Sequence, residues 1–108
     1  MKSESYLNFL GSKRCIFTNK KSIDLHHCNV IRKYSGYMKN KFDFGALPID
    51  HDIHLSMIHG KGEDYTFTHF NKDSKQLCVE YVKEYITLYD GVADDIELAK
   101  EALELLTR

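Results

Sequence analysis

The feature that most constrains the fold is an apolar repeat with helical spacing over residues 74–89. Apolar side chains stand there at positions 77, 78, 81, 82, 85, 86, 88 and 89, which places most of them on one side of a helix. Asp73 and Ser74 can cap its start, and Gly91 can end it. We therefore predict a long helix with one buried face, which the rest of the chain must cover.

Two further segments have helical spacing. The C-terminal stretch "ADDIELAKEALELLTR" has apolar residues along one side and acids near its start, and "SESYLNFLGSK" begins with the capping residue Ser3 and ends near Gly11. The chain is thus expected to have one helix at its N-terminus and two at its C-terminus.

Strands are expected between these helices. Residues 14–17 and 22–28 are predicted to form a hairpin around the polar turn at 19–21, followed by a basic loop at 32–45. A short helix is predicted after Pro48, ending at Gly60. The expected fold class is α+β in a single domain, 1–108, because 108 residues suffice for one core only.

Composition indicates the class of protein and its expected location in the cell. Hydrophobic residues make up 43% and charged residues 29% of the chain, as in globular domains. No apolar run is long enough to cross a bilayer, the first residues do not resemble a signal peptide, and the three cysteines have no C-x-x-C spacing. We expect a cytoplasmic protein without a membrane partner.

Charge is distributed unevenly. Residues 1–45 hold nine Lys/Arg and three Asp/Glu, whereas residues 46–108 hold six and thirteen. The basic half could face phosphates, although two ordinary solvated faces explain the same counts equally well.

Histidines give the strongest functional signal. Five of the six lie between positions 26 and 59, starting with the adjacent pair in "IDLHHCNVI". Neutral imidazole binds zinc, nickel, copper and manganese-type ions, and an ion with open coordination positions can polarise a phosphate. A histidine pair alone is more often structural, so its downstream neighbours decide its interpretation.

These neighbours follow a known order: His26-His27, a basic loop, Asp43, then Pro48 and His54 in "KFDFGALPIDHDIHLSMIHG". The order resembles the HNH nucleases, the His-Me finger or beta-beta-alpha-metal superfamily, especially small phage members related to recombination-enhancement nucleases. The resemblance covers about residues 13–62 and leaves 63–108 as a helical extension. It implies a beta-beta-alpha-metal core with a β-hairpin and a short helix.

The resemblance implies roles for individual residues. His27 would be the general base, Asp43 would orient the base or its loop, and His26 with His54 would bind a divalent ion (Mg, Mn, Ni or Zn). The helix ligand His59, or His51 in its place, would complete the site. Flanking phosphates would be held by basic residues of the loop, namely Arg32, Lys33, Lys39 and Lys41.

Two departures from the family pattern stand out. Cys15 has no partner cysteines at the positions of the family's zinc knuckle, so no structural zinc is expected. His59 follows His54 by five residues where the family has four, which separates the two side chains by roughly 140° on an α-helix. His59 would reach the ion only if the helix were distorted near Gly60, whereas His51 and His54 are only about 60° apart.

Two functions remain open. The first is a metal-dependent HNH-like endonuclease that hydrolyses nucleic acid, with DNA favoured as the substrate. The second is a catalytically inactive HNH-fold module, such as a phage inhibitor or adaptor, that binds nucleic acid or binds a protein through the C-terminal helices.

Overall fold

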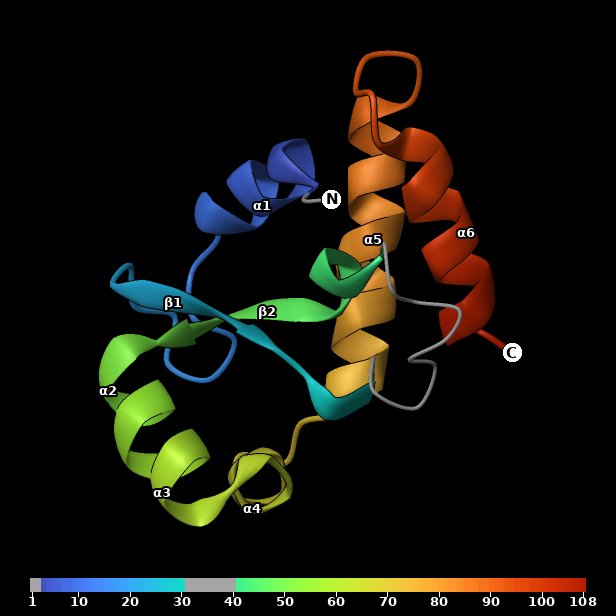
Figure 1. The fold of residues 1–108 in the computed structure, drawn as a ribbon. Coiled ribbons are helices and arrows are strands. Elements are labelled where there is room, and N and C mark those ends of the chain that lie inside the picture. The colour runs from blue at the N-terminus through green and yellow to red at the C-terminus, as the bar shows by residue number, and fades with distance from the viewer. Residues whose placement is uncertain (1–2, 31–40) are drawn as a thin grey trace.

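The computed structural model describes residues 3–30 and 41–108, and its mixed α+β architecture confirms the predicted fold class. The elements in chain order are α1 (Glu4–Gly11), β1 (Ile23–His27), the 3-10 turn η2 (Phe42–Gly45), β2 (Ala46–Asp50), α2 (His51–Ile53), the π-helical turn η3 (His54–Ile58), α3 (His59–Lys61), α4 (Glu63–His69), α5 (Ser74–Tyr89) and α6 (Ile96–Leu106). In Figure 1, α1 lies above the two strands, α2 to α4 lie below them, and the α5–α6 pair stands beside them.

The two strands pair antiparallel, with Leu25 opposite Pro48 and His26 opposite Leu47. The strand predicted at 14–17 is wrong, because these residues belong to a tight loop. The Cys15 N–H donates to the Lys20 carbonyl and the Asn19 N–H donates to the Cys15 carbonyl, both at 2.9 Å. The true partner of β1 therefore comes from the segment after the basic loop.

The helix predicted directly after Pro48 begins at His51, three residues beyond this proline. Pro48 lies within β2, and both strands of a two-stranded sheet have an outer edge where a missing N–H leaves the ladder intact. Asp50 caps the helix instead, since its Oδ1 accepts hydrogen bonds from the backbone N–H groups of Asp52 (3.0 Å) and Ile53 (3.3 Å). The helix runs on through α2, η3 and α3 to Lys61.

One hydrophobic core joins α1, both strands, α5 and α6. The three predicted helices are confirmed, and each contributes fully buried side chains, for example Leu10, Val82 and Ala102. The helix α4 was not predicted, because its seven residues are too few to show a clear periodicity. Within residues 3–30 and 41–108 no helix is long and apolar enough to cross a membrane.

Candidate functional site

A π-helical turn brings His54 and His59 together. Within η3 the His59 N–H donates to the His54 carbonyl, five residues earlier, so each turn holds one residue more than an α-helical turn. The two Nε2 atoms lie 3.2 Å apart and the ring centroids 4.6 Å apart. On a regular α-helix a five-residue step would separate these two rings. The wider π-helical turn, which lies before Gly60, brings them onto the same side of the helix.

Asp24 of β1 orients the ring of His54. Its Oδ2 accepts a hydrogen bond from His54 Nδ1 at 3.0 Å, and a carboxylate can only accept, so this nitrogen carries the proton. The Nε2 of a neutral His54 therefore presents a lone pair toward His59. This is the arrangement by which carboxylates orient metal-binding histidines in proteins.

The same carboxylate holds His51. Asp24 Oδ2 lies 2.8 Å from His51 Nδ1, on an exposed part of the surface. This hydrogen bond raises the pKa of His51, and the bonds from His51 and His54 lower the pKa of Asp24. His51 thus contacts Asp24 at the surface, and it is connected to the close pair of His54 and His59 only through this carboxylate.

His26 lies beside this pair, on the same face of the sheet as Asp24, because alternate residues of a strand share a face. Its ring centroid is 5.2 Å from that of His54. Its Nε2 contacts the Oε1 of Glu63 at 2.6 Å, and both oxygens of Glu63 also accept from the Asn29 N–H, at 3.1 and 2.9 Å. Glu63 was missed in the sequence, although an acid just after Gly62 is typical of the first turn of a helix.

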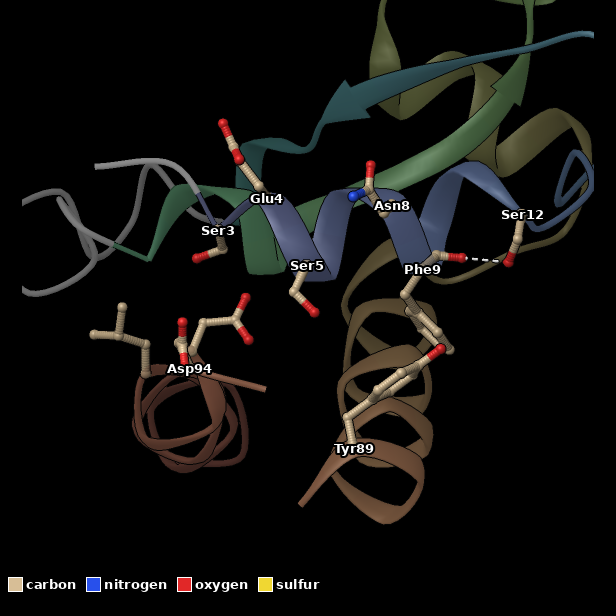
Figure 2. A pocket seen from close by; sticks show the side chains of 10 residues that line it. Ser3, Glu4, Ser5, Asn8, Phe9, Ser12, Tyr89 and Asp94 are labelled. Atoms are coloured by element: carbon tan, nitrogen blue, oxygen red, sulfur yellow. Dashed lines mark hydrogen bonds between the residues drawn. The ribbon is translucent and has the colours of Figure 1, made fainter. Parts of the chain in front are cut away.

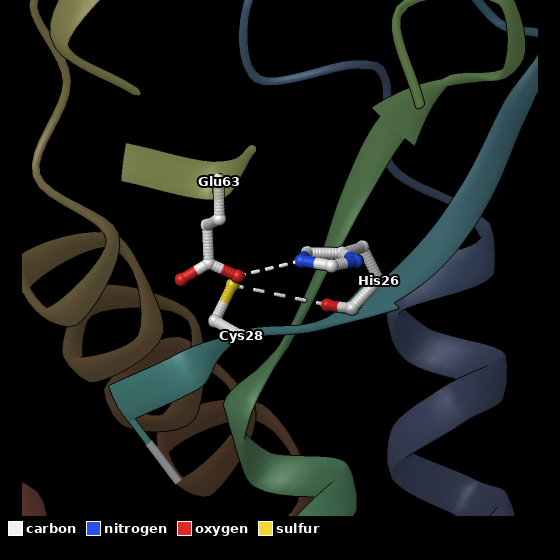
Figure 3. A group of neighbouring side chains, drawn as sticks. All are labelled: His26, Cys28 and Glu63. Atoms are coloured by element: carbon white, nitrogen blue, oxygen red, sulfur yellow. Dashed lines mark hydrogen bonds and ion pairs between the residues drawn. The ribbon is translucent and has the colours of Figure 1, made fainter. Parts of the chain in front are cut away.

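Cys28 completes a compact group with His26 and Glu63 (Figure 3). One possible ligand atom from each residue lies within 4.8 Å of the others. Cys28 and Glu63 are buried, with 1% and 8% of their surfaces exposed. Cys28 was missed as a candidate ligand in the sequence, since its spacing to other cysteines matches no metal motif.

His27 has a different partner. Its Nε2 lies 2.9 Å from Asp43 Oδ1, while Asp43 Oδ2 accepts a hydrogen bond from the Ser3 N–H at 2.8 Å. Asp43 is buried and the His27 side chain is 47% exposed. The structure therefore brings together the two residues predicted as base and orienting group, but His27 is not part of the group around His54.

The predicted phosphate contacts are only partly within the described residues. Lys41 forms an ion pair with Glu101 of α6, with 3.4 Å between Nζ and Oε2. Arg32, Lys33 and Lys39 lie outside the described residues.

A separate pocket of about 660 Å³ lies between α1 and the α5–α6 pair (Figure 2). Phe9 and Tyr89 line its apolar part, and Glu4 and Asp94 supply carboxylates. No histidine lines it, so its chemistry is independent of the histidine groups.

The described residues thus offer three polar groups: His54 with His59, His26 with Glu63 and Cys28, and His27 with Asp43. The first two contain metal-ligand types, and the third contains an exposed imidazole held by a buried carboxylate. Comparison of the chain with protein-family models, curated proteins and solved structures found no match.

Proposed function

We propose that this chain is a metal-dependent endonuclease that hydrolyses phosphodiester bonds of nucleic acid, with DNA as the favoured substrate. The observation that carries this proposal is the π-helical turn that places His54 Nε2 and His59 Nε2 3.2 Å apart beside His26. The order of β1, a basic segment, β2 and a histidine-bearing helix agrees with the resemblance to HNH nucleases.

The distance between the two Nε2 atoms suits a shared ion. Zinc binds imidazole nitrogen at about 2.0–2.1 Å with tetrahedral angles, so two such nitrogens stand roughly 3.3 Å apart. Without an ion, one ring must donate a proton to the other at this distance, and a cation would replace that proton. Open coordination positions would then leave room for water and a phosphate oxygen.

His27 supplies the base in this proposal. Asp43 accepts from Nε2, so a neutral His27 has its lone pair on Nδ1, which can take a proton from water. The buried carboxylate stabilises the imidazolium that forms, as the acid does in a catalytic triad. The metal would neutralise charge on the phosphorane, and the basic residues 32–41 would hold flanking phosphates.

A specific contact favours a second candidate, a module of the same fold that binds nucleic acid or protein without hydrolysis. His26 Nε2 already hydrogen-bonds the buried Glu63 carboxylate at 2.6 Å, so this nitrogen must leave its present partner, or share an ion with it, before it can serve as a ligand.

Cleavage of supercoiled plasmid with Mg²⁺, Mn²⁺, Ni²⁺ or Zn²⁺ separates the two candidates. We expect the wild type to nick or cut with at least one ion. His27→Ala should lose roughly 10²- to 10⁴-fold in turnover, the usual contribution of a general base, while still binding metal in a calorimetric titration. His54→Ala should lose cleavage and the metal ion that His54 and His59 would hold.

His69→Ala is the matched control, because it removes an exposed imidazole that stacks near Tyr65 and lies in α4, outside the groups described above. This variant should cut like the wild type. If the folded wild type cuts with none of the four ions, the hydrolytic proposal is refuted and the binding module remains.

A further inference from the structure

The group formed by His26, Cys28 and Glu63 contains one nitrogen, one sulfur and one oxygen ligand. Figure 3 shows the Glu63 carboxylate beside both the His26 ring and the Cys28 thiol. The His26 Nε2 to Glu63 Oε1 distance is 2.6 Å, and one ligand atom from each of the three residues lies within 4.8 Å of the others. His26 lies in β1, Cys28 comes directly after the end of this strand, and Glu63 starts α4, so the group joins separate elements.

These distances are close to those around zinc. Bonds of about 2.3 Å to sulfur and 2.0–2.2 Å to nitrogen or oxygen place tetrahedral ligands roughly 3.3–3.6 Å apart. The carboxylate and ring would separate slightly and the thiol would approach by at most about 1.2–1.5 Å, which side-chain rotations can supply. The backbone N–H of Asn29 already orients Glu63 through both of its oxygens, as outer hydrogen bonds orient metal-binding carboxylates.

Charge also favours a cation at this position. Glu63 is buried, and a buried carboxylate is stable when a positive charge lies beside it. A neutral His26 ring supplies a hydrogen bond but no such charge. A divalent cation bound by one carboxylate, one thiolate and one neutral imidazole gives no net charge. Binding would release the thiol proton of Cys28, and a neutral His26 would carry its proton on Nδ1 so that Nε2 could face the ion.

We propose that His26, Cys28 and Glu63 form a binding site for a thiophilic divalent cation of the zinc type, with water in the fourth position. The site does not require the chain to hydrolyse nucleic acid, and it differs from the His54–His59 position in having a sulfur ligand. The two positions share His26, whose Nε2 can bind only one ion at a time.

Cobalt(II) is the probe, because a thiolate bound to Co²⁺ produces a charge-transfer absorption that nitrogen and oxygen ligands do not. The full-length wild type should show this band on titration with Co²⁺, and Zn²⁺ should remove it. Cys28→Ser should abolish the band. Glu63→Gln should weaken Co²⁺ binding by more than the 10- to 100-fold that loss of an outer-shell partner costs.

Two controls locate the site. Cys15→Ser makes the same change at another buried thiol and should retain the band, as should His54→Ala, which removes the other ion position. In the wild type, Zn²⁺ should also slow alkylation of Cys28 but not of Cys15, as measured by peptide mass spectrometry. This second measurement needs no variant to fold.

A folded wild type without the charge-transfer band at saturating Co²⁺ would overturn the proposal, as would a band that survives Cys28→Ser. Unchanged alkylation of Cys28 in the presence of Zn²⁺ would overturn it too. Failure of plasmid cleavage with the band present would refute hydrolysis alone and leave this site standing.

Discussion

Asp43 couples the ring of His27 to the start of α1. One carboxylate oxygen lies 2.9 Å from His27 Nε2, and the other accepts the backbone N–H of Ser3 at 2.8 Å. The base proposed for hydrolysis is therefore positioned by a residue that also secures the N-terminal helix.

Asp43→Asn should affect both functions of this carboxylate. Loss of the fixed acceptor allows His27 to take either tautomer, so turnover should fall by about 10- to 100-fold if the chain hydrolyses DNA. A weaker bond to the Ser3 N–H should cost about 1–3 kcal/mol of unfolding free energy. Plasmid cleavage rates and urea unfolding measure the two effects, and Asp64→Asn, an exposed acid of α4, should change neither.

Asp24→Asn should lower the pKa of His51, which the hydrogen bond and charge of Asp24 raise. The stabilisation from protonated His51 is complete below its unfolded pKa of about 6.5 and is lost as the pH rises through the raised folded pKa. The pKa of Asp24 is lowered by the same contact, so its contribution is present above about pH 3.9 and is lost as the pH falls through the folded value. The pair is strongest between these limits.

Titration of the His51 ring by NMR tests this directly. Asp52→Asn is the control, because Asp52 raises the pKa of His51 through its charge alone and by less than Asp24 does, and this variant should shift the midpoint less. An unchanged midpoint in Asp24→Asn would show that the hydrogen bond does not form in solution.

Gly62→Ala should destabilise the protein, while Gly60→Ala should not. Gly62 has a φ of +102°, which a residue with a Cβ rarely adopts, although no described residue beyond its two chain neighbours has an atom within 4 Å of where that Cβ would stand. The cost is therefore purely conformational, about 1–3 kcal/mol. Gly60 lies in α3 with equally open space, so alanine there should stabilise by about 0.4–1 kcal/mol. Urea unfolding of both variants measures the contrast, and equal effects would contradict it.

Cys15 should be the first of the three thiols to react with iodoacetamide. Burial raises the pKa of Cys15, but hydrogen bonds from the Thr18 side chain and from backbone groups outweigh it and lower the pKa. The contact with Cys78 and burial raise the pKa of Cys28. The rate at Cys15 should therefore reach half its maximum below the usual value of about pH 8.5, as followed by peptide mass spectrometry. Faster labelling of Cys28 at every pH would contradict this order.

Tyr85→Phe should weaken the core without changing its shape. The buried hydroxyl donates to Asp95 and also hydrogen-bonds Ser5 Oγ at 2.8 Å. Its removal should cost about 1.5–3 kcal/mol, as for hydrogen bonds to charged groups. Tyr65→Phe removes a hydroxyl from a ring that is 52% exposed and should leave the unfolding midpoint unchanged. Matching midpoints for the two variants would show that the Asp95 contact contributes little.

The sequence predicts those parts of the fold that depend on local periodicity. The sequences of α1, α5 and α6 each show an apolar face, with a capping residue before α1 and α5 and acids near the start of α6, and all three helices form as expected. Strand pairing depends on residues far apart in the chain, so the nearby segment 14–17 was predicted as the partner of β1 and residues 46–50 were not recognised as a strand. The local pattern around Pro48 also favoured a helix start, since nothing in it reveals that the strand lies at a sheet edge.

The candidate site could also be predicted only in part from the sequence. Residue types indicated that the clustered histidines could bind a metal ion, and the resemblance to HNH nucleases implied the roles of His26, His54 and His59 and of Asp43 beside His27. Glu63 could not be connected to His26 from sequence, because 37 positions separate them and only the packing of α4 against the end of β1 brings them together. From sequence, His59 could reach the ion only if the helix were distorted near Gly60, and the π-helical turn η3 is such a distortion.

The extra residue held in η3 has a consequence for how such chains are recognised. Two histidines five positions apart can face each other as well as a pair four apart, provided that the intervening helix widens. A sequence motif that requires three residues between the two histidines does not match this chain. A motif that also allows four residues between them would match chains in which a π-helical turn brings the two rings together.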